Sequence, residues 1–126
     1  MTDNTKKVIA FDLDDVLCVR DSEEGKVEKY RTCRPVPEMI DTCNECYDLG
    51  YKIIIYTSRG MTGFEGDLDA IHSNLYELTA SQLKQWGVKY HDLVMGKTHY
   101  DLLIDDKAVN SATITNATDI TNAVNN

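Results

Sequence analysis

Residues 8–14 constrain the fold more than any other part of this sequence. The segment opens with four apolar residues, Val8 to Phe11, and closes on the acids Asp12 and Asp14. A short, almost wholly apolar run is typical of a β-strand that is buried on both faces, as in a parallel sheet. Because a charged side chain is costly inside such a core, we expect the acidic end of the strand to project into a cleft.

Further segments of the same kind alternate with predicted helices. We predict strands at residues 51–57, 93–95 and 100–106, with an edge strand at 111–115. Proline at 35 and 37 and glycine at 50 indicate a helix over residues 35–49, and an apolar stripe indicates a longer helix over 67–86. Strands that alternate with helices predict the α/β class, with a central parallel sheet covered on both faces. At 126 residues the chain is predicted to be one domain, with a flap at 15–34 and a polar tail at 116–126.

Reactive or charged side chains follow the ends of four predicted strands. In open parallel sheets, ligands bind beyond the carboxyl ends of the strands. We therefore expect these side chains to converge on one edge. They are Asp12 and Asp14, Thr57 and Ser58, Lys97, and Asp105 with Asp106.

Four carboxylates that meet at one edge repel one another unless a cation holds them together. Oxygen ligands in this number favour a hard divalent ion. Magnesium is the preferred interpretation, because it keeps several waters and accepts few protein oxygens; calcium and manganese remain alternatives. The predicted ligands are Asp12, Asp14 and Asp105, with Asp106 binding directly or through water.

The same residues suit phosphoryl transfer. A carboxylate can attack phosphorus to form an aspartyl-phosphate, and Asp12, the first acid after the strand, is our candidate nucleophile. Asp14 points the same way from an extended chain and can serve as general acid and base. Lys97 supplies a positive charge near the phosphoryl oxygens, and the Thr57 hydroxyl can donate to one of them.

These residues, in this order, resemble the haloacid dehalogenase superfamily. Its first motif is an apolar strand followed by Asp-x-Asp-x-(Thr or Val), which residues 12–16 match in full. Thr57 resembles the second motif, Lys97 the third, and Asp105 with Asp106 the acidic fourth. The resemblance covers residues 8–109 and implies a three-layer, Rossmann-like α/β/α fold with a magnesium-dependent phosphatase activity.

A looser resemblance concerns residues 96–108, which are similar to small phosphatases of capsular polysaccharide biosynthesis. It implies a phosphorylated sugar or related small metabolite as substrate. The alternatives are a phosphatase or phosphotransferase that acts on a macromolecule, and a non-catalytic module that binds phosphate or metal.

The superfamily often carries a large cap domain, and this chain has little room for one. Specificity is then expected to depend on the flap. Its basic cluster is either an ordinary solvated face or contacts an anionic substrate through Arg31 or Arg34; the cluster consists of Arg20, Lys26, Lys29, Arg31 and Arg34. Ser58 is predicted to bind the substrate. Arg59, which follows it, is predicted either at the rim of the cleft, in contact with substrate, or in a structural salt bridge. A capless site also suggests closure by a neighbouring subunit in a dimer or tetramer.

The formal charge of −8 disfavours general binding to nucleic acid, which needs an excess of basic residues. No apolar run reaches the roughly 20 residues that span a bilayer, so we expect no membrane association and a cytoplasmic location. Four cysteines without an export signal predict free thiols. Cys43 and Cys46 form a CxxC pair, but their helical spacing favours packing in a core over redox chemistry or zinc binding.

Overall fold

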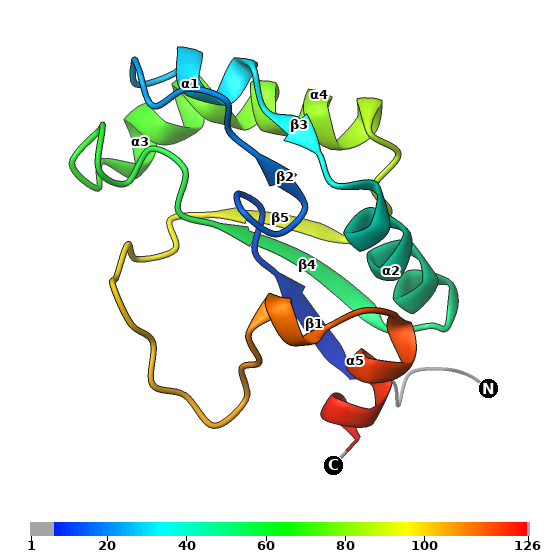
Figure 1. Cartoon of the computed structure of the whole chain (residues 1–126). Helices are drawn as coiled ribbons and strands as arrows, with labels where there is room; N and C mark the ends of the chain where they lie inside the picture. The colour runs from blue at the N-terminus through cyan, green and yellow to red at the C-terminus, as the bar shows by residue number, and fades with distance from the viewer. Residues whose placement is uncertain (1–6, 126) are drawn as a thin grey trace.

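A parallel three-stranded sheet forms the centre of the computed structural model, which describes residues 7–125 (Figure 1). Its strands are β1 (Val8–Phe11), β4 (Lys52–Thr57) and β5 (Asp92–Met95), in the order β1-β4-β5. Phe11 lies beside Ile55, and Thr57 beside Met95. The carboxyl ends of the three strands therefore meet at one edge, and the predicted α/β class with a parallel sheet is confirmed.

Only one face of this sheet is covered within the described residues. Ile53 and Ile55 of β4 are fully buried, whereas Tyr56, which points to the other face, is exposed. Val8 on β1 and Val94 on β5 are exposed as well. Since side chains alternate between the two faces of a strand, the sheet buries one face in the core and leaves the other open. Among residues 7–125, the predicted cover on the second face is not present.

Helix α2 (Pro37–Asp48) packs against β4 and begins and ends close to the predicted positions. Pro37 occupies the first turn, and Gly50, with a φ of 99°, follows the end of the helix. Cys43 and Cys46 are fully buried free thiols on the inner side of α2. Their interpretation as core residues is confirmed.

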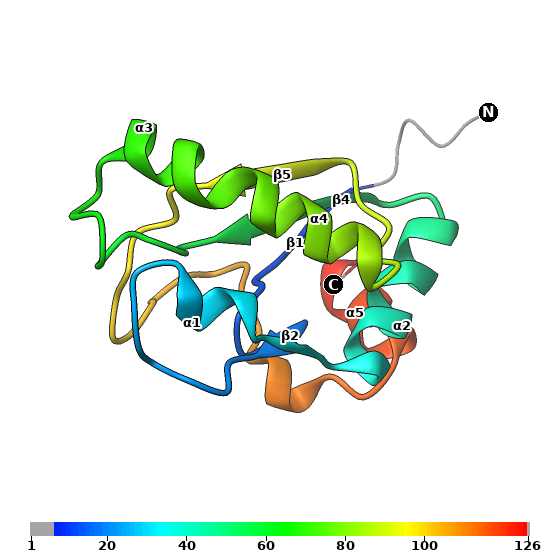
Figure 2. The ribbon, with the colours of Figure 1, turned by 90° about the horizontal axis from the view of Figure 1, so that it is seen from above.

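The long predicted helix is also present, as α3 (Leu68–Ile71), the π-helical segment η2 (His72–Tyr76) and α4 (Glu77–Gln85) in succession. The Asp67 side chain caps its start by accepting a hydrogen bond from the amide of Ala70. Figure 2 shows this helical stretch running along the sheet. Its buried stripe consists of Ile71, Leu75 and Leu83.

The predicted flap contains a short helix in addition to two extended pieces. Strand β2 (Cys18–Val19) pairs antiparallel with β3 (Arg34–Pro35), and α1 (Glu28–Arg31) lies between them in the chain. Tyr30 on α1 is buried, and its hydroxyl accepts a hydrogen bond from the amide of Gly60. The flap is thereby attached to the loop that follows β4.

Two predictions for the C-terminal third are wrong. Residues 100–106 form no strand; they belong to an irregular segment that loops away from the sheet (Figure 1). Leu102 is 76% exposed and Ile104 is 89% exposed. A strand needs a neighbour to complete its backbone hydrogen bonds, and within the described residues this segment has none.

The expected edge strand at 111–115 is a 3₁₀ turn, η3 (Ser111–Thr113), and the expected polar tail is largely helix α5 (Ala117–Val124). Residue 126 of that tail lies outside the described residues. Ala117 and Ile120 bury one side of α5, which contacts α2. The Asn116 side chain caps α5 by accepting a hydrogen bond from the amide of Asp119.

Among residues 7–125, no helix has the length and apolar character that crossing a bilayer requires.

Candidate active site

A cleft of about 480 Å³ opens where β1, β4 and β5 end. Its walls combine acidic, basic and hydroxyl side chains and come from the ends of β1 and β4, the flap and the segment after β5. The charged residues that line it are Asp12, Asp14, Asp15, Glu23, Arg20, Lys29, Arg59 and Lys97. This is the edge at which the sequence predicts the site.

Asp12 follows directly after β1 and presents its carboxylate to the cleft. One oxygen, Oδ1, accepts a hydrogen bond of 2.8 Å from the amide of Leu13. The other, Oδ2, lies 3.4 Å from Nζ of Lys97. The Asp12 side chain is 39% exposed, so an atom in the cleft can approach it.

Lys97 reaches Asp12 from beyond the end of β5. Its amide donates to the carbonyl of Thr57 at 3.0 Å, which fixes the backbone beside β4. Its Nζ lies 5.7 Å from the ring centre of Tyr56 and 5.4 Å from that of Tyr100. Burial disfavours the charged amine, but Asp12 and then Tyr100 outweigh that effect and raise the pKa of Lys97 above its ordinary value. Lys97 is thus a fixed positive charge beside Asp12.

Asp14, in contrast, is held by Arg59. The Arg59 Nε lies 3.0 Å from Oδ2 of Asp14, and Nη2 lies 3.1 Å from Oδ1. Such a bidentate pair fixes the plane of the carboxylate as well as its distance. The predicted proximity of Asp12 and Asp14 in one cleft is observed, with Asp14 more enclosed than expected.

The Arg59 guanidinium is fully buried and pairs with Asp14, so the salt-bridge interpretation is confirmed. Arg59 also belongs to the lining of the cleft. Its Nη1 donates to Thr79 at 3.1 Å and to Gln82 at 2.6 Å on α4. Burial opposes its charge, but the hydrogen bonds and charge of Asp14 raise the pKa of Arg59. The long helix thereby holds the arginine that holds Asp14.

Thr57 and Ser58 end β4 with different surroundings. Thr57 is buried, and its hydroxyl oxygen accepts a hydrogen bond of 3.1 Å from the amide of Arg59. Its own proton remains available to a neighbouring acceptor. Ser58 lines the cleft, as its predicted role in binding requires.

Of the basic flap residues, Arg34 lies outside the cleft, because it pairs with Asp21 at 2.8 Å on the exposed side of β3. Arg20 and Lys29 line the cleft instead. The Arg20 Nε is buried without a hydrogen-bond partner, 3.4 Å from a carboxylate oxygen of Glu23. Sequence analysis placed both residues in the basic cluster, but no local pattern distinguishes those that face inward.

Asp105 and Asp106 do not line the cleft with Asp12 and Asp14, contrary to the predicted metal site. Both are exposed in the irregular segment after β5. The carboxylate of Asp105 accepts a hydrogen bond of 2.8 Å from the amide of Lys107. That bond, followed by one involving Asp106, lowers the pKa of Asp105.

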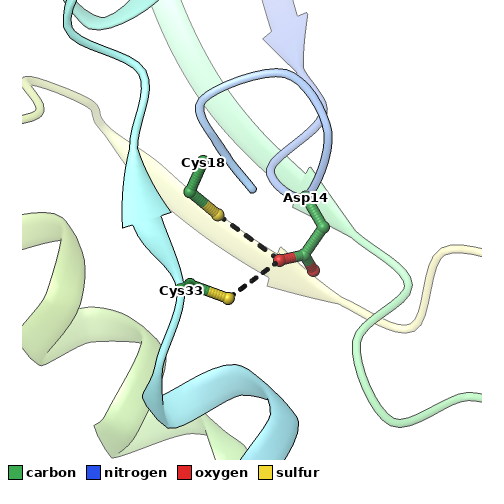
Figure 3. A group of neighbouring side chains, drawn as sticks. All are labelled: Asp14, Cys18 and Cys33. Carbon is green, nitrogen blue, oxygen red and sulfur yellow. Dashed lines mark hydrogen bonds between the residues drawn. The ribbon is translucent and has the colours of Figure 1, made fainter. Parts of the chain in front are cut away.

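Two thiols complete the surroundings of Asp14, and sequence analysis missed them. Cys18 Sγ lies 3.4 Å and Cys33 Sγ 3.7 Å from Oδ1 of Asp14 (Figure 3). The three ligand-type atoms lie within 4.8 Å of one another, but Nη2 of Arg59 contacts all three, at 3.1 to 3.6 Å. A guanidinium therefore stands where a metal ion would have to bind, and the group is no cation site in this arrangement.

The two thiols differ in acidity. A hydrogen bond with Cys18, assisted by the charge of Arg59 and opposed by burial, lowers the pKa of Cys33. The same hydrogen bond, together with burial and Asp14, raises the pKa of Cys18. Cys33 is thus the more easily deprotonated of the two.

Comparison with known proteins gives a likeness of fold. No family model and no curated protein matches the sequence. The crystal structure of an MCSG target from Vibrio cholerae matches with a TM-score of 0.80 and 27% sequence identity, over 94% of this chain and 97% of that one. The two chains therefore share their architecture over nearly their whole length.

Proposed function

We propose that this protein is a phosphatase that hydrolyses a phosphate monoester, with Asp12 as the nucleophile. The observation that carries the proposal is the accessible Asp12 carboxylate at the end of a buried parallel strand, 3.4 Å from Lys97 in a cleft of about 480 Å³. The resemblance of residues 12–16 to the first motif of the haloacid dehalogenase superfamily supports the same assignment.

Asp12 is well oriented for attack on phosphorus. The Leu13 amide holds Oδ1, which leaves Oδ2 on the side of Lys97 and the cleft. Attack by Oδ2 would form an aspartyl-phosphate and expel the alcohol, and water would then release phosphate. Lys97 would stabilise the negative charge that the phosphoryl oxygens carry in both steps.

Asp14 is our candidate for proton transfer to the alcohol and from the water. Arg59 makes two contacts with Oδ1 and one with Oδ2, so Oδ2 is the oxygen with more capacity to exchange a proton. Arg59 is then a positioning residue, because its Nε and Nη2 donate to Asp14 and its Nη1 donates to Thr79 and Gln82. The hydroxyl of Thr57 and that of Ser58 would donate to phosphoryl oxygens.

The substrate class follows from the charges and size of the cleft. Arg20, Lys29 and Lys97 supply three positive charges around it. The buried Nε of Arg20 lies 3.4 Å from a carboxylate oxygen of Glu23 but has no hydrogen-bond partner, and an anionic ligand would provide an acceptor for it. Small-molecule sites commonly measure about 300–1,000 Å³, so a phosphorylated sugar or similar metabolite fits.

Magnesium is the metal that the donors fit best. Asp12 offers an accessible carboxylate oxygen, and Asp15 lines the same wall, whereas both oxygens of Asp14 already accept hydrogen bonds from Arg59. A hard cation with few protein ligands and several waters matches this set. When bound, it would offset the repulsion between the phosphate and the Asp12 carboxylate.

Asp105 and Asp106 would join this site if residues 100–106 paired with the free edge of β1. Among the described residues, β1 pairs only with β4, so its other edge offers unpaired backbone groups. Leu102, Leu103 and Ile104 are exposed and apolar, which makes their burial favourable. A parallel fourth strand there would place the two acids beside Asp12 and extend the sheet toward a Rossmann-like fold.

The proposal is tested with p-nitrophenyl phosphate and a panel of sugar phosphates, with Mg²⁺ and with EDTA. We expect Mg²⁺-dependent release of phosphate, and a loss of about 10³-fold or more in kcat for Asp12→Asn. Asp92→Asn is the matched control, because Asp92 begins β5 at the opposite edge of the same sheet. Its activity should stay within about twofold.

Beryllium fluoride, which mimics a phosphoryl group, gives an independent readout of the nucleophile. We expect the adduct on Asp12. An adduct on Asp14 or Asp15, or equal activity of Asp12→Asn and the unchanged protein, would contradict the assignment.

A further inference from the structure

Cys18 and Cys33 form a thiol pair that the proposed reaction does not use. They come from the two sides of the flap: Cys18 opens β2, and Cys33 directly precedes β3. Both sulfur atoms lie against Oδ1 of Asp14 and within 4.8 Å of each other (Figure 3). The β2–β3 ladder has only two residue pairs, so a small shift of the flap can bring the sulfurs together.

The two thiols also differ in access. Cys18 is completely buried. Cys33 lines a second cavity of about 300 Å³, bounded by Arg31, Gln82 and Trp86, which lies outside the cleft of Asp12. A small oxidant can therefore reach Cys33 without passing through the substrate cleft.

We propose that Cys18 and Cys33 form a reversible disulfide in response to hydrogen peroxide, and that this bond lowers activity by displacing the Arg59–Asp14 pair. The second half of the statement rests on the proposed phosphatase function; the first half does not. A transient disulfide of this kind is compatible with a reducing compartment, where catalytic and redox-sensing disulfides are the ones that occur.

The chemistry proceeds in two balanced steps. The Cys33 sulfur, as thiolate, attacks one oxygen of hydrogen peroxide; the O–O bond breaks, and the leaving hydroxide takes up the proton that Cys33 lost, giving water and a sulfenic acid. The Cys18 sulfur then attacks the sulfenic sulfur; the S–S bond forms, the S–OH bond breaks, and hydroxide leaves with the Cys18 proton as a second water. Two thiols are oxidised, and one peroxide is reduced to two waters.

Disulfide formation must disturb the site because the sulfurs have to move. They now lie within 4.8 Å and must approach to about 2.0 Å. Both contact Nη2 of Arg59, at 3.6 Å for Cys18 and 3.5 Å for Cys33, and both contact Asp14. Oxidation removes the two S–H groups and shifts the sulfurs. Asp14 thereby loses its two thiol hydrogen-bond donors, and Nη2 of Arg59 loses its two sulfur contacts.

The first measurement is chemical. The protein is treated with hydrogen peroxide, quenched, and digested with trypsin and Asp-N without reduction. Trypsin alone leaves Cys33, Cys43 and Cys46 in one peptide, since Arg34 precedes proline; cleavage before Asp41 separates Cys33 from the other two. We expect residues 15–20 linked to residues 32–40, with a loss of two hydrogen masses. Four unlinked thiols, or Cys33 oxidised to sulfinic acid instead, would overturn the disulfide.

The second measurement is the ratio of activity before and after peroxide. We expect kcat to fall at least tenfold in the unchanged protein and to recover with dithiothreitol. Cys33→Ser should hold the ratio near one, whereas Cys46→Ala, which alters a buried thiol on α2, should retain the fall. A linked peptide with unchanged kcat would overturn the effect on the site.

A third readout keeps the two proposals separable. If neither form releases phosphate, the proposed function fails, but the peptide masses still decide the disulfide. The NMR signal of the Arg59 Nε–H group reports the displacement without any catalysis. We expect it to shift or exchange faster after oxidation; an unchanged signal in the linked protein would contradict the displacement.

Discussion

Residues 8–14 and 100–106 are two apolar segments that each end in a pair of acids, and the structure treats them differently. In the first, β1 pairs with β4 along its whole length, and Arg59 fixes Asp14. In the second, the apolar residues are exposed, and within residues 7–125 the bonding partners of Asp105 are its sequence neighbours Asp106 and Lys107. Similar local sequences thus adopt different structures. A strand forms only where a neighbouring strand can pair with its backbone and a core can bury its apolar side chains.

The acids of the two segments differ in the same way. Asp14 is compensated by a buried guanidinium contributed from 45 residues away. Asp105 and Asp106 remain exposed to water, where a carboxylate needs no buried partner, and Asp106 lies 3.9 Å from the equally exposed Lys107. Residues 8–14 therefore supply both a core strand and acids of the proposed site. Residues 100–106 lie outside the core, but their exposed acids are free to take part in the site.

The largest effect is expected from the contact that locks the first segment. Arg59→Met leaves Asp14 enclosed without its partner, and breaking a buried ion pair from one side costs about 3–5 kcal/mol. The free energy of unfolding from urea denaturation measures the loss. The control is Arg34→Met, which removes the exposed Arg34–Asp21 pair and should cost no more than about 1 kcal/mol. Equal losses in the two variants would show that the Arg59 pair is not specially important for stability.

The sequence predicts those strands and helix ends that are determined by residues close together in the chain. The strands around Phe11 and Ile55 follow from apolar runs, and the ends of α2 follow from Pro37 and Gly50, since these signals act within a few residues. The thiols of α2 were assigned to the core by the same helical periodicity. Convergence of Asp12 and Lys97 follows in turn from the parallel order of the strands.

The sequence does not predict partners that meet only in the folded chain. Arg59 could be placed next to Ser58, but its contacts with Asp14 and Gln82 come from remote segments. The strand predicted at 100–106 depends on a vacant edge of β1, which local apolar character cannot specify. Helix α5 was missed because its Thr and Asn residues are weak helix formers, while its cap at Asn116 and its packing on α2 stabilise it.

An intermediate effect is expected from the acids of the second segment. If residues 100–106 dock beside β1 when metal binds, Asp105→Asn should weaken the apparent Mg²⁺ affinity in the phosphatase assay by about tenfold or more, which is 1.4 kcal/mol. Stability without metal should change by less than about 0.5 kcal/mol, because Asp105 is exposed. Asp101→Asn, exposed in the same segment, is the matched control. An unaltered Mg²⁺ dependence in both variants would exclude the second segment from the metal site.

The smallest effect concerns the turn at Asp105 in the metal-free protein. Because the Lys107 amide and then Asp106 lower the pKa of Asp105, its carboxyl should titrate below the ordinary value of 3.8 when followed by NMR. With a depressed folded-state pKa, the stabilisation of this turn is present above the unfolded-state value and is lost as the pH falls through the folded-state value. Lys107→Pro removes the donating N–H and should move the titration toward 3.8, whereas Lys107→Ala keeps the N–H and loses only the smaller effect of the lysine charge. If Asp105 titrates at or above 3.8 in the unchanged protein, the exposed turn is not the metal-free state, and the contrast between the two segments disappears.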